Sequence, residues 1–81
     1  MLILLFLFMA ACATEEKSKE KETAILHFNL GIAHLEGGRY PEALKQMLIA
    51  NDLDPNNPLI LNNLGLAYFV REKYLEALNN L

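Results

Sequence analysis

One segment of this chain repeats itself after 34 residues. LGIAHLEGGRYPEAL at Leu30–Leu44 returns as LGLAYFVREKYLEAL at Leu64–Leu78. Eight of 24 positions are identical when residues 24–47 are aligned with 58–81: Asn29/Asn63, Leu30/Leu64, Gly31/Gly65, Ala33/Ala67, Tyr40/Tyr74, Glu42/Glu76, Ala43/Ala77 and Leu44/Leu78. A repeat of this period is typical of arrays in which each unit buries its apolar face by stacking on its neighbours.

Each unit is expected to be a pair of helices, which makes the fold class all-α. Ala24–Glu36 and Pro41–Leu53 have helix-compatible apolar patterns, and Gly37-Gly38 between them supplies residues that end a helix. The helix at Ala24–Glu36 is apolar on two sides, so it should contact two neighbours. One side carries Leu26, Leu30 and Ala33.

The segment DPNNP at residues 54–58 separates the two units. Asn57 is the expected N-cap of the next helix and Pro58 its first residue. Within the first unit, the small Ala43 is expected to face Gly31, because two helices approach closely only where one of them lacks bulk.

At its signature positions the repeat resembles the tetratricopeptide repeat (TPR), an α-solenoid of stacked helix-turn-helix units. The matching residues are Leu30, Gly31, Ala43, Ala50 and Pro55 in the first unit and Leu64, Gly65, Tyr68 and Ala77 in the second. The resemblance implies a full repeat at residues 24–57 and an incomplete one at 58–81, truncated inside its second helix. It also implies that the chain binds a protein or peptide.

The first 23 residues differ in composition from the repeat. Residues 1–13 are wholly apolar and residues 14–23 wholly polar. The apolar run is too short to cross a bilayer as a helix. Because it ends in small residues, it is typical of a cleavable signal peptide, here residues 1–11. Residues 12–23 would then be a solvated tether; alternatively, Glu16–Glu22 continues as a charged helix into Ala24.

Met9-Ala10-Ala11-Cys12 resembles the lipobox of bacterial lipoproteins, in which the cysteine is lipidated. The resemblance implies lipidation at Cys12, for example by palmitate. Since Ala13 and not an aspartate follows, it also implies an anchor in the outer membrane, facing the periplasm. The alternative for Cys12 is an inert thiol in an ordinary signal peptide or in an N-terminal helix.

A lipobox followed by TPR units looks like the type IV pilus biogenesis lipoproteins, or pilotins, which assist assembly of the outer-membrane secretin. The resemblance implies a non-enzymatic scaffold of an envelope assembly, with a secretin as its partner. Two alternatives remain. The repeats are an accessory segment of a larger periplasmic enzyme, such as a protease or cell-wall hydrolase, or the chain is a cytosolic TPR adaptor.

Composition argues against several other classes of function. The net charge is −3 and the basic residues are not clustered, so nucleic acid is not an expected partner. The chain has one cysteine, which excludes an intramolecular disulfide.

His27 and His34 would lie about 10.5 Å apart along a helix, too far to share a zinc ion. Neither a metal nor a cofactor is expected. Glu42 and Glu76 are expected near helix starts and not as an acid/base pair.

One apolar stripe is the expected peptide-binding groove, because the first helix of each TPR unit lines the concave side of the array. This groove stripe consists of Ile25, Phe28, Ile32 and Leu35 in the first unit and Leu59, Asn62, Leu66 and Phe69 in the second. TPR proteins that clamp a C-terminal carboxylate place Lys and Asn where Phe28 and Ile32 stand here. We therefore expect an amphipathic or extended apolar segment in the groove; alternatively, the N-terminal segment or further repeats cover it.

Overall fold

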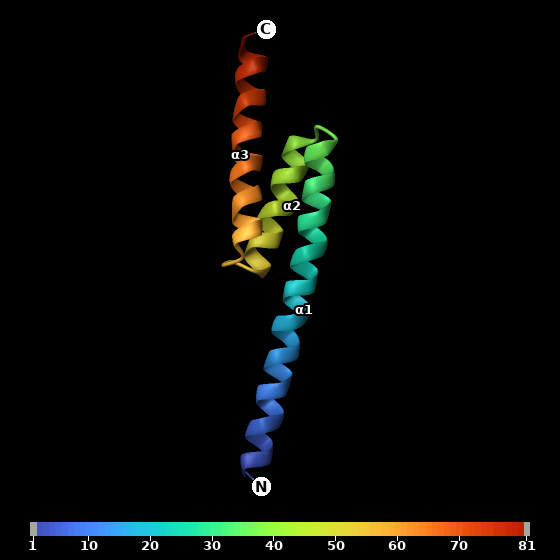
Figure 1. Cartoon of the computed structure of the whole chain (residues 1–81), viewed down its shortest axis with the longest axis vertical. Helices are drawn as coiled ribbons and strands as arrows, with labels where there is room; N and C mark the ends of the chain where they lie inside the picture. The colour runs from blue at the N-terminus through green and yellow to red at the C-terminus, as the bar shows by residue number, and fades with distance from the viewer. Residues whose placement is uncertain (1, 81) are drawn as a thin grey trace.

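Three helices make up the fold: α1 (Leu2–Glu36), α2 (Tyr40–Leu53) and α3 (Pro58–Asn79). The computed structural model describes the backbone of residues 2–80 and the side chains of residues 16–80. α2 runs back beside the C-terminal half of α1, and α3 turns again to run beside α2 (Figure 1). The all-α, helix-turn-helix prediction is therefore confirmed.

α1 is longer than the repeat requires, because it also includes the charged segment before Ala24. The side chains of residues 16–23 are exposed along this part of the helix, and the Thr23 hydroxyl donates to the Lys19 carbonyl oxygen at 2.9 Å. The structure thus shows the charged helix that was the alternative to an irregular tether. In the part of the chain that the structure describes, no helix combines the length and apolarity of a membrane span.

The turn between α1 and α2 depends on Gly38. Its φ is +75°, a left-handed conformation that glycine adopts without steric cost. The Gly37 amide donates to the Ala33 carbonyl at 3.0 Å and the Arg39 amide to the His34 carbonyl at 2.8 Å, so the helix end keeps its hydrogen bonds. α2 then begins with Pro41 in its first turn.

The turn between α2 and α3 forms as the sequence predicts. Asn57 is the N-cap of α3, and its Oδ1 accepts a hydrogen bond from the Leu59 amide at 3.0 Å. Its Nδ2 also donates to Asp54 Oδ2 at 3.0 Å, which ties the cap to the end of α2.

The second unit has no turn at the position where the first unit has one. α3 continues as one helix to Asn79, whereas the 34-residue alignment places a turn near residues 71–73. Arg71 and Glu72 stand at the positions of Gly37 and Gly38. Both are good helix formers, and neither adopts a positive φ without strain. Glu76 consequently lies far from a helix start, in contrast to the expectation, while Glu42 is in the first turn of α2.

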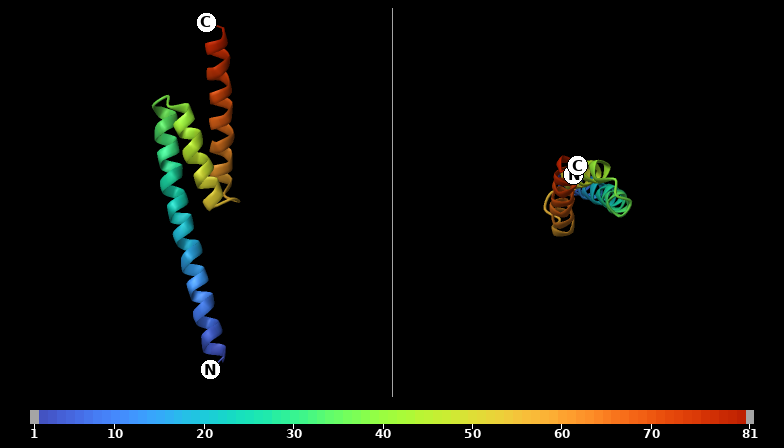
Figure 2. Two further views of the ribbon diagram at one scale, coloured as in Figure 1. Left: turned by 180° about the vertical axis from the view of Figure 1, so that it is seen from behind. Right: turned by 90° about the horizontal axis from the view of Figure 1, so that it is seen from above.

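α2 lies between the other two helices, and the core is built around it (Figure 2). One cluster contains Leu44 and Met47 from α2 with Leu64 and Ala67 from α3. A second joins one residue from each helix: Ala24, Ala50 and Ile60. Two of the three members of the second cluster are alanines, which allows the helices to approach closely there.

Gly31 of α1 is buried against α2, but its nearest neighbour there differs from the prediction. A Cβ at Gly31 would lie 2.8 Å from Met47 Cε and 3.1 Å from Met47 Cγ. The side chain nearest to Gly31 is thus Met47 and not the expected Ala43. Met47 is the largest side chain that α2 buries completely, so it takes the space that the glycine leaves.

Candidate functional site

The structure divides the predicted groove stripe into two parts. On α1, Phe28, Ile32 and Leu35 are half-buried against the cluster of Leu44, Met47, Leu64 and Ala67. Phe28 also packs against the second cluster. These three side chains hold the helices together. Ile25, one turn earlier, is exposed.

On α3 the same stripe is open. Leu59, Leu66 and Phe69 are 58%, 49% and 57% exposed, and Asn62 is exposed among them. A shallow depression lined by Pro58, Leu59, Leu61 and Asn62 lies at the N-terminal end of the stripe. Exposed apolar side chains gathered on one side of a helix are typical of a protein-interaction surface. The α3 part of the stripe is therefore the candidate binding surface.

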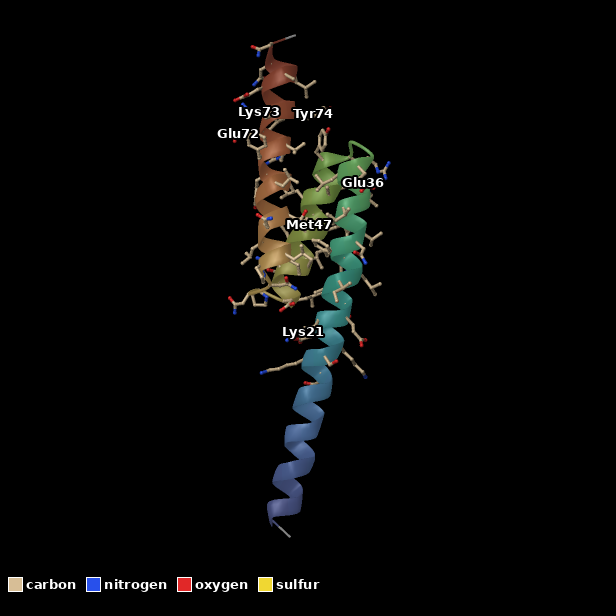
Figure 3. The ribbon with its side chains drawn as sticks, viewed as in Figure 1. Lys21, Glu36, Met47, Glu72, Lys73 and Tyr74 are labelled. Atoms are coloured by element: carbon tan, nitrogen blue, oxygen red, sulfur yellow. The ribbon has the colours of Figure 1, made fainter. Side chains whose placement is uncertain are left out.

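The far end of this surface carries charge, which the sequence interpretation missed. Lys73 Nζ lies 5.7 Å from the centre of the Phe69 ring and 3.3 Å from Glu76 Oε2. Figure 3 shows Lys73 beside Glu72 where α3 extends past the turn between α1 and α2. Both members of the ion pair are well exposed, so it adds little stability. The pair gives this end of the apolar stripe a polar border. The i, i+3 and i, i+4 spacing of these residues was the signal available in the sequence.

Two aromatic rings join the C-terminal half of α3 to the start of α2. Tyr40 and Tyr74, which share one repeat position, make an edge-to-face contact with 5.5 Å between ring centroids. Such a pair contributes about 0.5–1.5 kcal/mol beyond its buried area. Tyr74 and the buried residues Ile60, Leu64 and Ala67 all lie on the side of α3 that faces α2. The groove stripe on α3 therefore faces away from α2.

The two histidines have separate partners and lie in the interface of α1 with α2 and its turn. His27 Nδ1 is 2.6 Å from Gln46 Oε1 on α2, and His34 Nδ1 accepts a hydrogen bond from Arg39 Nε at 2.9 Å. Within residues 16–80 no group of three potential metal ligands comes together. The arrangement of these side chains is that of helix packing.

Cys12 lies outside the residues whose side chains are described, as does the whole of the proposed signal peptide at residues 1–11.

Comparison with known proteins agrees with the helical arrangement. The TPR repeat family model matches residues 31–70. This span contains the end of α1, all of α2 and the first half of α3. No curated protein and no solved structure matches the chain.

Proposed function

Starting from the TPR repeat at residues 31–70, which indicates a protein–protein interaction role, we propose that this chain is a lipid-anchored, non-enzymatic scaffold for assembly of an envelope complex. The observation that carries the proposal is the exposed apolar stripe on α3, formed by Leu59, Leu66 and Phe69. A stripe of this kind takes the apolar side of a partner helix or of an extended segment.

The proposed anchor is the Cys12 side chain, acylated after removal of residues 1–11. It is supported by the apolar run that ends in Ala10-Ala11 and by the polar residues that follow the cysteine. In the structure residues 16–23 form an exposed part of a helix that continues into the repeat. Such a helix would hold the binding surface at a distance from the bilayer. Because Ala13 follows the cysteine, we place the anchor in the outer membrane, facing the periplasm.

The proposed assembly is the type IV pilus machinery, with a secretin subunit as partner. Support comes from the combination of a lipobox-like segment with TPR sequence, which is the domain order of pilotins. The partner segment would be an amphipathic helix or apolar strand with few charges, because three of the four stripe residues on α3 are apolar and exposed.

Phe69→Glu tests the binding surface. The Phe69 ring is exposed, so the variant should fold, but a carboxylate would be desolvated in the complex. We expect secretin recovered with the tagged chain from native envelopes to fall about tenfold or more. Leu30→Glu is the matched control, since Leu30 is also an exposed apolar residue, on α1 outside the stripe. Phe28→Glu is unsuitable because Phe28 packs in both core clusters.

Undiminished recovery with Phe69→Glu would place the interface elsewhere. Recovery of cell-wall enzymes without secretin would exclude the pilotin role and favour an accessory role for the repeats.

Cys12→Ser tests the anchor independently. With radiolabelled palmitate, we expect label in the native chain and none in the variant, which should leave the membrane fraction because its acyl chains are lost. Equal fractionation of the two chains without label would exclude lipidation and favour a cytosolic adaptor.

A further inference from the structure

One side of α1 carries apolar side chains that no other described residue covers. Leu26 and Leu30 are 64% and 49% exposed, and Ala33 is exposed beside them. We call these three residues the outer side of α1. They are distinct from the groove stripe, whose α1 residues Phe28 and Ile32 pack against the core.

The repeat indicates that the outer side of α1 is a packing surface. Its counterparts on α3 are Ile60, Leu64 and Ala67, and all three are buried in the clusters that α3 shares with α2. The same kind of surface is therefore covered in one unit and uncovered in the other. Apolar surface of this kind gains free energy when water is removed from it.

The outer side of α1 is aligned with position 12, where the proposed anchor is attached. α1 is one helix from Leu2 to Glu36 and has no turn along its length (Figure 1). Position 30 is 18 residues after position 12, which corresponds to about five turns of an α-helix. The two positions thus lie on one line along α1, about 27 Å apart.

We propose that the outer side of α1 docks on the bilayer that holds the lipid anchor, so that α1 lies along the membrane surface. This inference rests on the proposed lipidation of Cys12. After the proposed cleavage the chain begins at Cys12, and no earlier helix of this chain is left to cover Leu26 and Leu30. The acyl chains hold one end of the line at the bilayer, so the rest of the line meets the same surface at a high effective concentration.

The residues between position 12 and Leu26 determine which lipid surface this side fits. Glu16, Lys19 and Thr23 continue the line at spacings of four, three and four residues from position 12, and all three are exposed. One acidic and one basic side chain leave this part of the line without net charge. Docking therefore depends on the apolar residues and the acyl chains, and not on attraction to anionic headgroups. A zwitterionic phosphatidylcholine bilayer should be sufficient.

Docking through α1 leaves the groove stripe free for a protein partner. A rigid α1 can hold the binding surface away from the bilayer in two ways, standing upright or lying flat. The outer side of α1 favours the flat orientation, because an upright helix leaves Leu26 and Leu30 in water. In the flat orientation α2 lies between α1 and α3, and the exposed Leu66 and Phe69 stay accessible. Loss of the α1 contact should therefore not change recovery of the protein partner.

Single tryptophans test this orientation, because the chain has no tryptophan of its own. Leu30→Trp places an indole on the outer side of α1. Leu66→Trp, on the groove stripe, is the matched control, since both leucines are 49% exposed. Each variant is expressed as the full chain, purified from membranes and reconstituted into phosphatidylcholine vesicles with or without brominated acyl chains, which quench an indole on contact. Vesicles are isolated by flotation before fluorescence is measured.

In chains that float with the vesicles, we expect brominated lipid to remove most of the fluorescence of Leu30→Trp and little of that of Leu66→Trp. Equal quenching of the two variants, or quenching of neither, would overturn this inference and leave the anchor in place. A chain that does not float would overturn the anchor and the docking together.

A second substitution shows whether the native side chains drive the contact, because an indole is itself attracted to a membrane interface. Adding Leu26→Glu to Leu30→Trp should abolish the quenching while the chain still floats, since a carboxylate on this side resists desolvation. Quenching that persists with Leu26→Glu would mean that the introduced indole, and not the outer side of α1, makes the contact.

Discussion

At the scale of single residues, Met47 lies where all three helices meet. It is completely buried, lies against Gly31 on α1 and belongs to the cluster that contains Leu64 of α3. One flexible side chain therefore contacts both neighbours of α2. A thioether side chain suits this position because it adapts to an irregular space.

Met47→Ala should lower the free energy of unfolding by about 2–5 kcal/mol, since it removes buried methylene and sulfur atoms and leaves a cavity. Urea denaturation followed by circular dichroism measures this loss. Leu48→Ala on the same helix is the control, because Leu48 is 38% exposed and should cost less than half as much. Equal losses would show that Met47 is not the central contact.

The sequence was sufficient to predict helix caps and turns. It was not sufficient to predict which side chain a given core residue packs against. Asn57 and Gly38 were identifiable because capping and left-handed turns need particular residue types. That Gly31 faces Met47 instead of Ala43 depends on the rotation of α2 about its axis. This rotation is set jointly by contacts with α1 and α3, which no local pattern contains.

At the scale of elements, two helices are longer than the repeat predicts. α1 begins before Ala24 because the preceding Glu and Lys residues are good helix formers. α3 passes the position of the expected turn because Arg71-Glu72 replace Gly37-Gly38. The 34-residue period predicted where each unit begins, whereas the substitutions within it decided whether a turn forms.

For the candidate site, the stripe itself was predictable. The burial of its α1 part was not, since that depends on how α2 and α3 meet.

The N-terminal part of α1 should be separable from the three-helix core. Side chains 16–23 are exposed, so their helix gains no stability from packing. We expect Lys19→Pro to reduce the helical signal in circular dichroism, because proline in a helix interior costs about 3 kcal/mol. The urea midpoint of the core should stay unchanged, with Lys19→Ala as the control. A lower midpoint with Lys19→Pro would mean that this segment contacts the core.

At the scale of the whole molecule, the chain is a short stack with exposed sides at both outer helices. On α3, Ile60, Leu64 and Ala67 are buried against α2, while their α1 counterparts Leu26, Leu30 and Ala33 are exposed. The helix α2 is therefore the only element in the described residues that is packed on two sides by other helices. A core of this size is marginal by itself, and it gains most from partners that cover the outer helices.

Equivalent sides of α1 and α3 differ in this structure: α2 covers the side of α1 at Gly31, whereas the side of α3 at Gly65 is exposed. Gly31→Leu and Gly65→Leu, unfolded separately in urea at a concentration where sedimentation shows a monomer, test it most directly. Each change adds about 1 kcal/mol of helix propensity. At Gly31 overpacking against Met47 should cost about 1–3 kcal/mol, so we expect stability to fall. At Gly65, where no atom lies within 4 Å, stability should rise. Equal losses at the two glycines would mean that the two sides are packed alike.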